Sequence, residues 1–307
     1  MKLGVFSPVL AQTGFKEMVE YLASLGVQQL EMGAGGYPGK AHFDPEILLK
    51  DEGKIEEIKE ILKENNMSIA AISCHGNPVH PDKKEAERYH NDFNNAALLA
   101  EKLGVDTMVG FSGCPGDSEK SLRPNWVTCS WPPEFEETLK WQWEEVLIPY
   151  WKKEVEFLKA HGIKRVAFEM HPGFCVYNPE SLLKLRAAVG DIIGANFDPS
   201  HLTWQGIDPS EAIKALGKAN AIHHFHAKDT KIDEANKSVN GVLDVKPYGN
   251  ILDRSWTFRT VGYGNGKEMW NSMISTLKTV GYDGVISIEH EDALMSPKEG
   301  LEKAISF

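Results

Sequence analysis

Short runs of apolar and β-branched residues alternate along the whole chain with longer segments of helical periodicity. Eight such runs lie at residues 3–6, 27–31, 69–73, 107–110, 165–169, 193–197, 222–226 and 284–289. Each run is followed by a segment that predicts a helix, and regular β-α alternation is typical of a parallel sheet. Because eight parallel strands close a barrel, the pattern predicts the α/β class and a (β/α)8 TIM barrel.

No linker and no change of composition divides the chain, so we expect a single domain over residues 1–307. Helix starts are marked where a capping side chain precedes proline, at Asn178, Asp208 and Ser296. Two stretches, 112–133 and 230–264, are too long for tight loops. Insertions at the carboxyl ends of barrel strands often form the functional site, so we expect both stretches near it.

The overall charge restricts the partners that we expect. A formal net charge of −11 opposes binding to nucleic acids and to anionic membranes, and the sequence contains no basic patch. No apolar run approaches the roughly 18 residues that a bilayer span requires. The four cysteines lie far apart and no export signal is visible, so we expect a soluble, cytoplasmic protein.

The register of the predicted strands brings four polar side chains to one place. In the run RVAFE at 165–169, an inward Glu169 leaves Val166 and Phe168 to face the helices. The same alternation applied to the next predicted strands places an inward acidic or histidine side chain at each end, which gives Glu169, Asp198, His226 and Glu289. Side chains at the ends of neighbouring barrel strands converge, so these four predict a common site.

The ligand types of this set indicate the class of metal. Three carboxylates and an imidazole, without a thiolate, suit a hard or borderline dication such as Mn²⁺, Mg²⁺ or Co²⁺, and Zn²⁺ also fits. With a neutral histidine the bare site carries three negative charges, which could not lie together without a cation. The sequence therefore predicts one divalent metal ion.

Six motifs carry a resemblance to a known family. They are SCHGNPVHP, FEMHPG, NFDPSHL, HHFHAKD, VGYGNG and ISIEHED, in this order along the chain. With them the chain resembles the xylose isomerase-like TIM-barrel superfamily, in particular its sugar isomerases and epimerases. The resemblance implies that the same four residues bind one metal, that the partner is a small sugar, and that the protein forms a homo-oligomer.

The resemblance also implies a mechanism. A metal that chelates a ketose carbonyl and the adjacent hydroxyl acidifies the C–H between them. Glu169 and Glu289 are the expected catalytic residues. One removes the proton from this C–H, which forms the enediolate, and the other returns a proton to it. Return to the opposite face gives epimerisation, and return to the neighbouring carbon gives aldose–ketose isomerisation.

Further side chains near this site are expected to contact the substrate. Histidines beside a metal can orient substrate hydroxyl groups or move protons. A lysine or arginine can hold a substrate oxygen, and an aromatic side chain can pack against the C–H face of a sugar. The expected contacts are His75, His171, His201, Lys228, Arg259 and Trp126.

Three other functions remain open from the sequence. A lyase, such as an inosose dehydratase or a 3-keto-glycoside β-eliminase, uses the same enolate. A sugar-binding barrel without turnover would keep the same ligands. An apurinic-endonuclease-like nuclease needs additional metal ligands, and this chain has Gly110, Phe111 and Ser112 at the place of one of them, so the charge and the ligands both disfavour it.

Overall fold

The computed structural model describes all residues, 1–307, and its strands form a closed barrel. The eight barrel strands are β1 (Lys2–Phe6), β2 (Gln29–Gly36), β3 (Ser68–His75), β4 (Thr107–Gly110), β5 (Arg165–Glu169), β6 (Ile193–Phe197), β7 (Ile222–Ala227) and β10 (Val285–Ile288). Neighbours pair in parallel in the order β1-β10-β7-β6-β5-β4-β3-β2, and β2 closes back on β1. The predicted (β/α)8 barrel is confirmed, with one strand at each predicted run.

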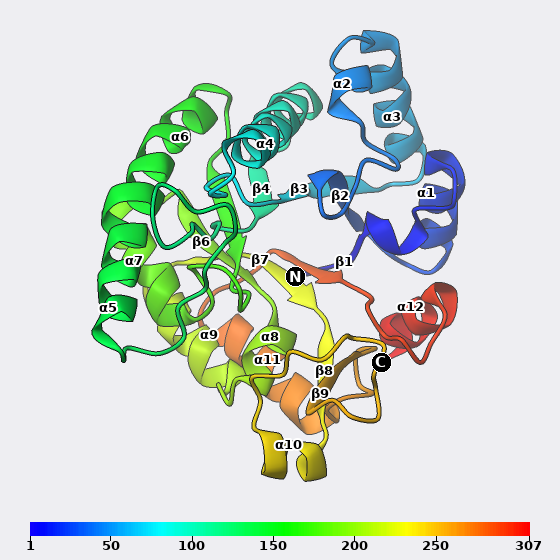
Figure 1. Cartoon of the computed structure of the whole chain (residues 1–307). Helices are drawn as coiled ribbons and strands as arrows, with labels where there is room; N and C mark the ends of the chain where they lie inside the picture. The colour runs from blue at the N-terminus through cyan, green and yellow to red at the C-terminus, as the bar shows by residue number, and fades with distance from the viewer.

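Helices surround the barrel (Figure 1). They are α1 (Phe15–Ser24), α2 (Pro45–Leu48), α3 (Glu52–Glu64), α4 (Lys83–Leu103), α5 (Pro133–Trp141), α6 (Ile148–Ala160), α7 (Pro179–Val189), α8 (Pro199–Trp204), α9 (Pro209–Lys218), α10 (Glu234–Asn240), α11 (Lys267–Thr279) and α12 (Pro297–Ser306). The last helix lies beside the first, where the Tyr21 hydroxyl donates to Glu302 Oε1 at 2.8 Å. None of the helices is long and apolar enough to cross a membrane.

Capping side chains begin the helices as the sequence predicts. Asn178 Oδ1 accepts from the Ser181 backbone N–H, and Asp208 and Ser296 cap α9 and α12 in the same way. In each case proline follows the cap, and its fixed φ suits the first helical turn.

Successive side chains of each barrel strand point alternately outward to the helices and inward to the barrel, so the core has two separate parts. Val166 and Phe168 belong to a large apolar cluster that the strands share with the helices, whereas Ala167 packs with Ala71 and Val109 in a separate small cluster. The other face of the strands is polar and fully buried toward the mouth, with Glu31, Ser73, Asn196, His224 and Ser287. The barrel interior is therefore polar beneath the predicted metal site.

The second strand departs from the prediction for residues 27–31, because it begins at Gln29 and continues to Gly36. Glycines at 33, 35 and 36 resemble a loop in sequence, yet they continue the pairing with β3 through a register shift. Gly36 has φ 63°, and a Cβ there would lie 1.8 Å from the His75 carbonyl oxygen. The glycine is therefore required for β2 to approach the end of β3.

The stretch 230–264, expected as a long loop, contains its own structure. Strands β8 (Asp229–Ile232) and β9 (Trp256–Arg259) pair in an antiparallel sheet, and α10 lies between them in the chain. This excursion projects to one side of the barrel, at the bottom of Figure 1. Its pairing joins segments more than 20 residues apart, so no short-range turn signal marks it.

Candidate metal centre

The four predicted ligands lie together at the mouth of the barrel. Glu169, Asp198, His226 and Glu289 come from the ends of β5, β6, β7 and β10, which are consecutive strands of the barrel. Their ligand atoms lie within 4.8 Å of one another. His226 Nδ1 is 3.3 Å from Glu169 Oε2 and 3.0 Å from Glu289 Oε2. Ligands at about 2.0–2.2 Å from a single ion lie roughly 3–4.4 Å apart, so these two pairs already have the spacing of one coordination sphere and the whole group is only slightly wider.

Two buried atoms of this group make no hydrogen bond, Asp198 Oδ2 and His226 Nδ1, although Asp198 Oδ2 lies within ion-pair distance of Lys228 Nζ. Asp198 caps α8 and accepts from the Ser200 N–H through Oδ1 at 2.8 Å, which leaves Oδ2 for the mouth. His226 directs Nε2 away from the mouth and Nδ1 toward the carboxylates of Glu169 and Glu289. Buried polar atoms are nearly always hydrogen-bonded, so His226 Nδ1, which faces two carboxylate oxygens without a hydrogen bond, fits a cation bound between them.

The electrostatics of the site favour a dication. Lys228 is buried, and its Nζ lies 3.1 Å from Asp198 Oδ2 and 2.8 Å from Glu289 Oε2. Burial would raise the pKa of Glu289, but Lys228 and His226 lower it to about 2. The pKa of Glu169 is likewise well below its usual value, against the effect of burial, because histidines donate to it. Burial raises the pKa of Asp198, against the effect of Lys228 and His201. When all three carboxylates are ionised, which is the form that binds metal, one ammonium among them leaves an excess of negative charge that a dication offsets.

A pocket of about 380 Å³ opens onto two of the four ligands, Glu169 and Glu289. Its walls combine polar groups with apolar and aromatic side chains. The other lining residues are Phe6, Pro8, Val9, Tyr37, Pro38, His75, Phe111, His171, His201, Lys228, His290, Glu291 and Pro297. Eight of the fifteen lining residues are histidine, glutamate or lysine, so the pocket suits a small hydrophilic molecule rather than an apolar one.

Three predicted histidines line the pocket. His201 Nε2 is 2.9 Å from Glu169 Oε1, and His75 Nε2 is 3.2 Å from Glu169 Oε2. The ring of His171 packs against that of His201, with centroids 4.1 Å apart. Burial lowers the pKa of both His171 and His201, so these rings are neutral at pH 7. Neutral imidazoles can donate to a substrate oxygen or accept from a hydroxyl group.

Lys228 also lines the pocket, but the structure does not bring Trp126 or Arg259 into it. Arg259 on β9 donates through Nε to Asp292 Oδ2 at 3.0 Å. Trp126 packs edge-on against Tyr177, 5.5 Å between centroids, beside smaller cavities. Sequence reasoning placed both by their position in long loops, which does not give the direction of a side chain.

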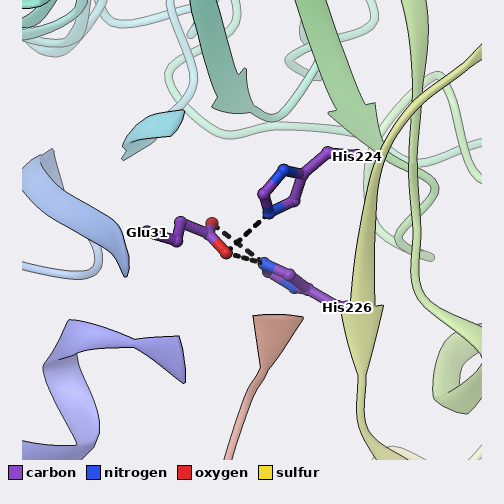
Figure 2. A group of neighbouring side chains, drawn as sticks. All are labelled: Glu31, His224 and His226. Carbon is purple, nitrogen blue, oxygen red and sulfur yellow. Dashed lines mark hydrogen bonds and ion pairs between the residues drawn. The ribbon is translucent and has the colours of Figure 1, made fainter. Parts of the chain in front are cut away.

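Sequence reasoning missed Glu31, a fully buried carboxylate on β2 (Figure 2). Its Oε2 lies 2.8 Å from His224 Nε2, 2.8 Å from His226 Nε2 and 2.7 Å from Ser287 Oγ. Burial would raise the pKa of Glu31, but His226 and His224 lower it well below its usual value. The available signal was a charged residue on an otherwise apolar strand, since buried charges are rare unless paired.

Asp229, which follows Lys228 and was expected from the sequence at the rim of the site, instead holds the VGYGNG segment in place. Its Oδ2 accepts from the backbone N–H groups of Gly262, Gly264 and Asn265 at 3.0, 3.2 and 3.0 Å. The same oxygen accepts from Trp270 Nε1 at 3.1 Å, which lies on α11. Oδ1 of Asp229 accepts from the Thr230 backbone N–H and from Asn265 Nδ2 as well, so one buried carboxylate satisfies six donors and joins β8 to the segment before α11.

Replacing Asp229 with Ala is expected to lower the free energy of unfolding by about 3–5 kcal/mol, because several buried N–H groups lose their only acceptor. Chemical denaturation followed by circular dichroism measures this. Asp233→Ala is a matched control, since Asp233 only caps the exposed helix α10, and its loss should cost about 1 kcal/mol. Equal stability of the two variants would contradict the role of Asp229.

Comparison with known proteins places this site in a family. The model of the family "Xylose isomerase-like TIM barrel" matches residues 15–307. The chain is 39% identical over 308 residues to the uncharacterized protein YfiH of Bacillus subtilis, covering 99% of this chain and 97% of YfiH.

Two solved structures share the fold. The IOLI protein with a bound zinc atom superposes with a TM-score of 0.66 at 18% identity, over 100% of this chain and 96% of that one. The 3-keto-D-glucoside 4-epimerase YcjR of E. coli gives 0.66 at 12% identity, over 100% and 98%. At these identities the structural likeness supports the fold alone, whereas the family model covers almost the whole chain. The protein belongs to the xylose isomerase-like TIM-barrel family.

Proposed function

We propose that this protein is a divalent-metal-dependent enzyme that isomerises or epimerises a keto-sugar. The observation that carries the proposal is the convergence of Glu169, Asp198, His226 and Glu289 at one point, with Glu169 and Glu289 lining a pocket of about 380 Å³. The zinc atom bound in the IOLI structure and the epimerase activity named for YcjR support it.

The chain would supply the proton transfers. A bound dication would polarise the carbonyl of the sugar and acidify the neighbouring C–H. Glu169 and Glu289, from strands β5 and β10, would act as base and acid on the reacting carbon. The position to which the proton returns decides between epimerisation and isomerisation. His226 and Asp198, more deeply buried, would serve as ligands alone.

Other polar groups of the pocket would orient the sugar. His201 lies 2.9 Å from Glu169 Oε1 and 3.3 Å from Lys228 Nζ, and it is neutral at pH 7. It would exchange its contact with Glu169 for a contact with a substrate hydroxyl. Lys228, which already contacts Glu289, would hold a substrate oxygen near the same carboxylate. Phe6 and Phe111 offer the apolar wall against which the C–H face of a sugar packs.

The charges of the pocket favour an uncharged sugar over a sugar phosphate. Its lining contains one lysine and no arginine. The Nζ of that lysine, Lys228, already contacts Asp198, Glu289 and Glu291. A phosphate would meet these carboxylates without a free cation to pair with, and phosphate recognition usually employs arginine or a free ammonium.

Hydrogen exchange tests the proposal directly. Protein loaded with Mn²⁺ and incubated in deuterated water with a panel of ketoses, inososes and 3-keto-glycosides should place deuterium next to the carbonyl of one class. Mass spectrometry measures the exchange, and chromatography identifies the isomer. Ultraviolet absorbance from an enone would instead reveal elimination by the same site. Metal binding without exchange on any member of the panel would contradict the proposal.

A further inference from the structure

We propose that Glu31 is a positioning residue of the metal centre, which holds His226 with Nδ1 free to bind the ion. The inference rests on the proposed metal site. Figure 2 shows the rings of His224 and His226 both directed at the Glu31 carboxylate. His226 Nε2 is 2.9 Å from Oε1 and 2.8 Å from Oε2 of Glu31.

The contact crosses the inside of the barrel. Glu31 lies on β2, which pairs with β1 and β3, whereas His226 lies on β7, which pairs with β6 and β10. Both side chains are fully buried. Pairing of neighbouring strands therefore does not bring them together, and the contact depends on both side chains pointing into the interior.

The ionised carboxylate fixes which nitrogen of His226 carries the proton. A carboxylate only accepts hydrogen bonds, so the Nε2 atom that faces it must bear hydrogen. In the neutral ring the lone pair is then on Nδ1, the atom that faces Glu169 and Glu289. A hydrogen bond from the distal nitrogen to a carboxylate also makes the imidazole a stronger ligand.

Glu31, His224 and His226 could themselves suggest a second metal site, because their ligand atoms also lie within 4.8 Å of one another. The hydrogen bonds favour the positioning role. Glu31 has four donors around it, the two rings and the hydroxyls of Ser73 and Ser287, and a carboxylate has about four acceptor positions. The Glu31 carboxylate is satisfied without an ion, whereas His226 Nδ1 makes no hydrogen bond and faces the carboxylates of Glu169 and Glu289.

Glu31→Gln tests the role while preserving the volume of the side chain. An amide accepts at only one of its two ends, so it cannot accept from all four donors that surround Glu31, and it lacks the negative charge. We expect the Kd for Mn²⁺, measured by calorimetry, to rise about 10–100-fold. The absorption spectrum of the Co²⁺-loaded protein should change as well, because the spectrum reports the geometry of the ligands.

Glu154→Gln is the matched control. Glu154 on α6 is also a buried glutamate beside a histidine, with Oε2 3.4 Å from His90 Nδ1, but it lies outside the site. This variant should retain the Kd of the wild-type protein. Equal Kd values for Glu31→Gln and wild type would overturn the inference and leave the metal centre in place. A wild-type protein that binds no dication would overturn both the inference and the proposed function.

A second measurement needs no variant and covers the case in which Glu31→Gln does not fold. In the Zn²⁺-loaded wild-type protein, nitrogen NMR of labelled histidine should show His226 with the metal on Nδ1 and a proton on Nε2. Metal on Nε2, or Nε2 without a proton, would overturn the inference.

Discussion

Glu169→Gln is expected to lower kcat/KM by about 10³-fold, the middle of the range for loss of a general acid or base. One oxygen of Glu169 faces His226 within the ligand group, and the other faces His201 in the pocket. An amide cannot take a proton from carbon and is a weaker metal ligand. The variant should therefore lose deuterium exchange and also bind Mn²⁺ more weakly. The substrate found in the exchange assay provides the kinetic measurement.

Glu154→Gln is the control for Glu169→Gln. The comparison distinguishes a loss of activity that is specific to the site from a general effect of removing a buried carboxylate. Glu154 is as buried as Glu169 and contacts His90 rather than the pocket. Exchange by the Glu154 variant should equal that of the wild type. If Glu169→Gln retained exchange within threefold of wild type while metal was bound, another group would have to be the base.

Binary pattern and register were sufficient to predict the barrel and the convergence of Glu169, Asp198, His226 and Glu289 at its mouth. In β5 the alternation of Val166, Ala167 and Phe168 separates the two faces of the strand, and the structure assigns those faces as predicted. Because the strand period is two, one correct apolar face fixes the direction of every side chain on that strand. The inward direction of Glu169 was predicted from the apolar face of β5. The directions of Asp198, His226 and Glu289 were predicted from their strands in the same way.

Contacts between distant segments were not available from the sequence. Glu31 meets His226 across the barrel, and Arg259 meets Asp292 between β9 and the segment after β10. Neither pair is related by strand period or by local spacing. From the sequence Arg259 was expected to contact the substrate, whereas in the structure it pairs with Asp292. A charged residue on an apolar strand marked Glu31 as unusual, but nothing in the sequence indicated its partner.

Removal of the divalent metal is expected to lower the Tm by about 5–10 °C. A ligand that binds only the folded state stabilises it by about 2.7 kcal/mol at a hundredfold excess over Kd, and each kcal/mol shifts the Tm of a large domain by about 2–4 °C. Because Glu169 and Glu289 are far apart in the sequence, the unfolded chain does not bring the four proposed ligands together and should not bind the ion. Calorimetry of chelator-treated protein, with and without added Mn²⁺, measures the shift.

Asp198→Asn gives this experiment an internal control. Asparagine retains the oxygen that caps α8, where Oδ1 accepts from the Ser200 N–H, and asparagine is as good a capping residue as aspartate. It replaces Oδ2 with an amide N–H₂ group that cannot bind a cation, and Lys228, which lies 3.1 Å from Oδ2, keeps its contacts with Glu289 and Glu291. The variant should therefore fold with its helix intact and show almost no Tm shift with Mn²⁺. A shift of wild-type size in Asp198→Asn would mean that the ion binds elsewhere, because only the ligand atom differs.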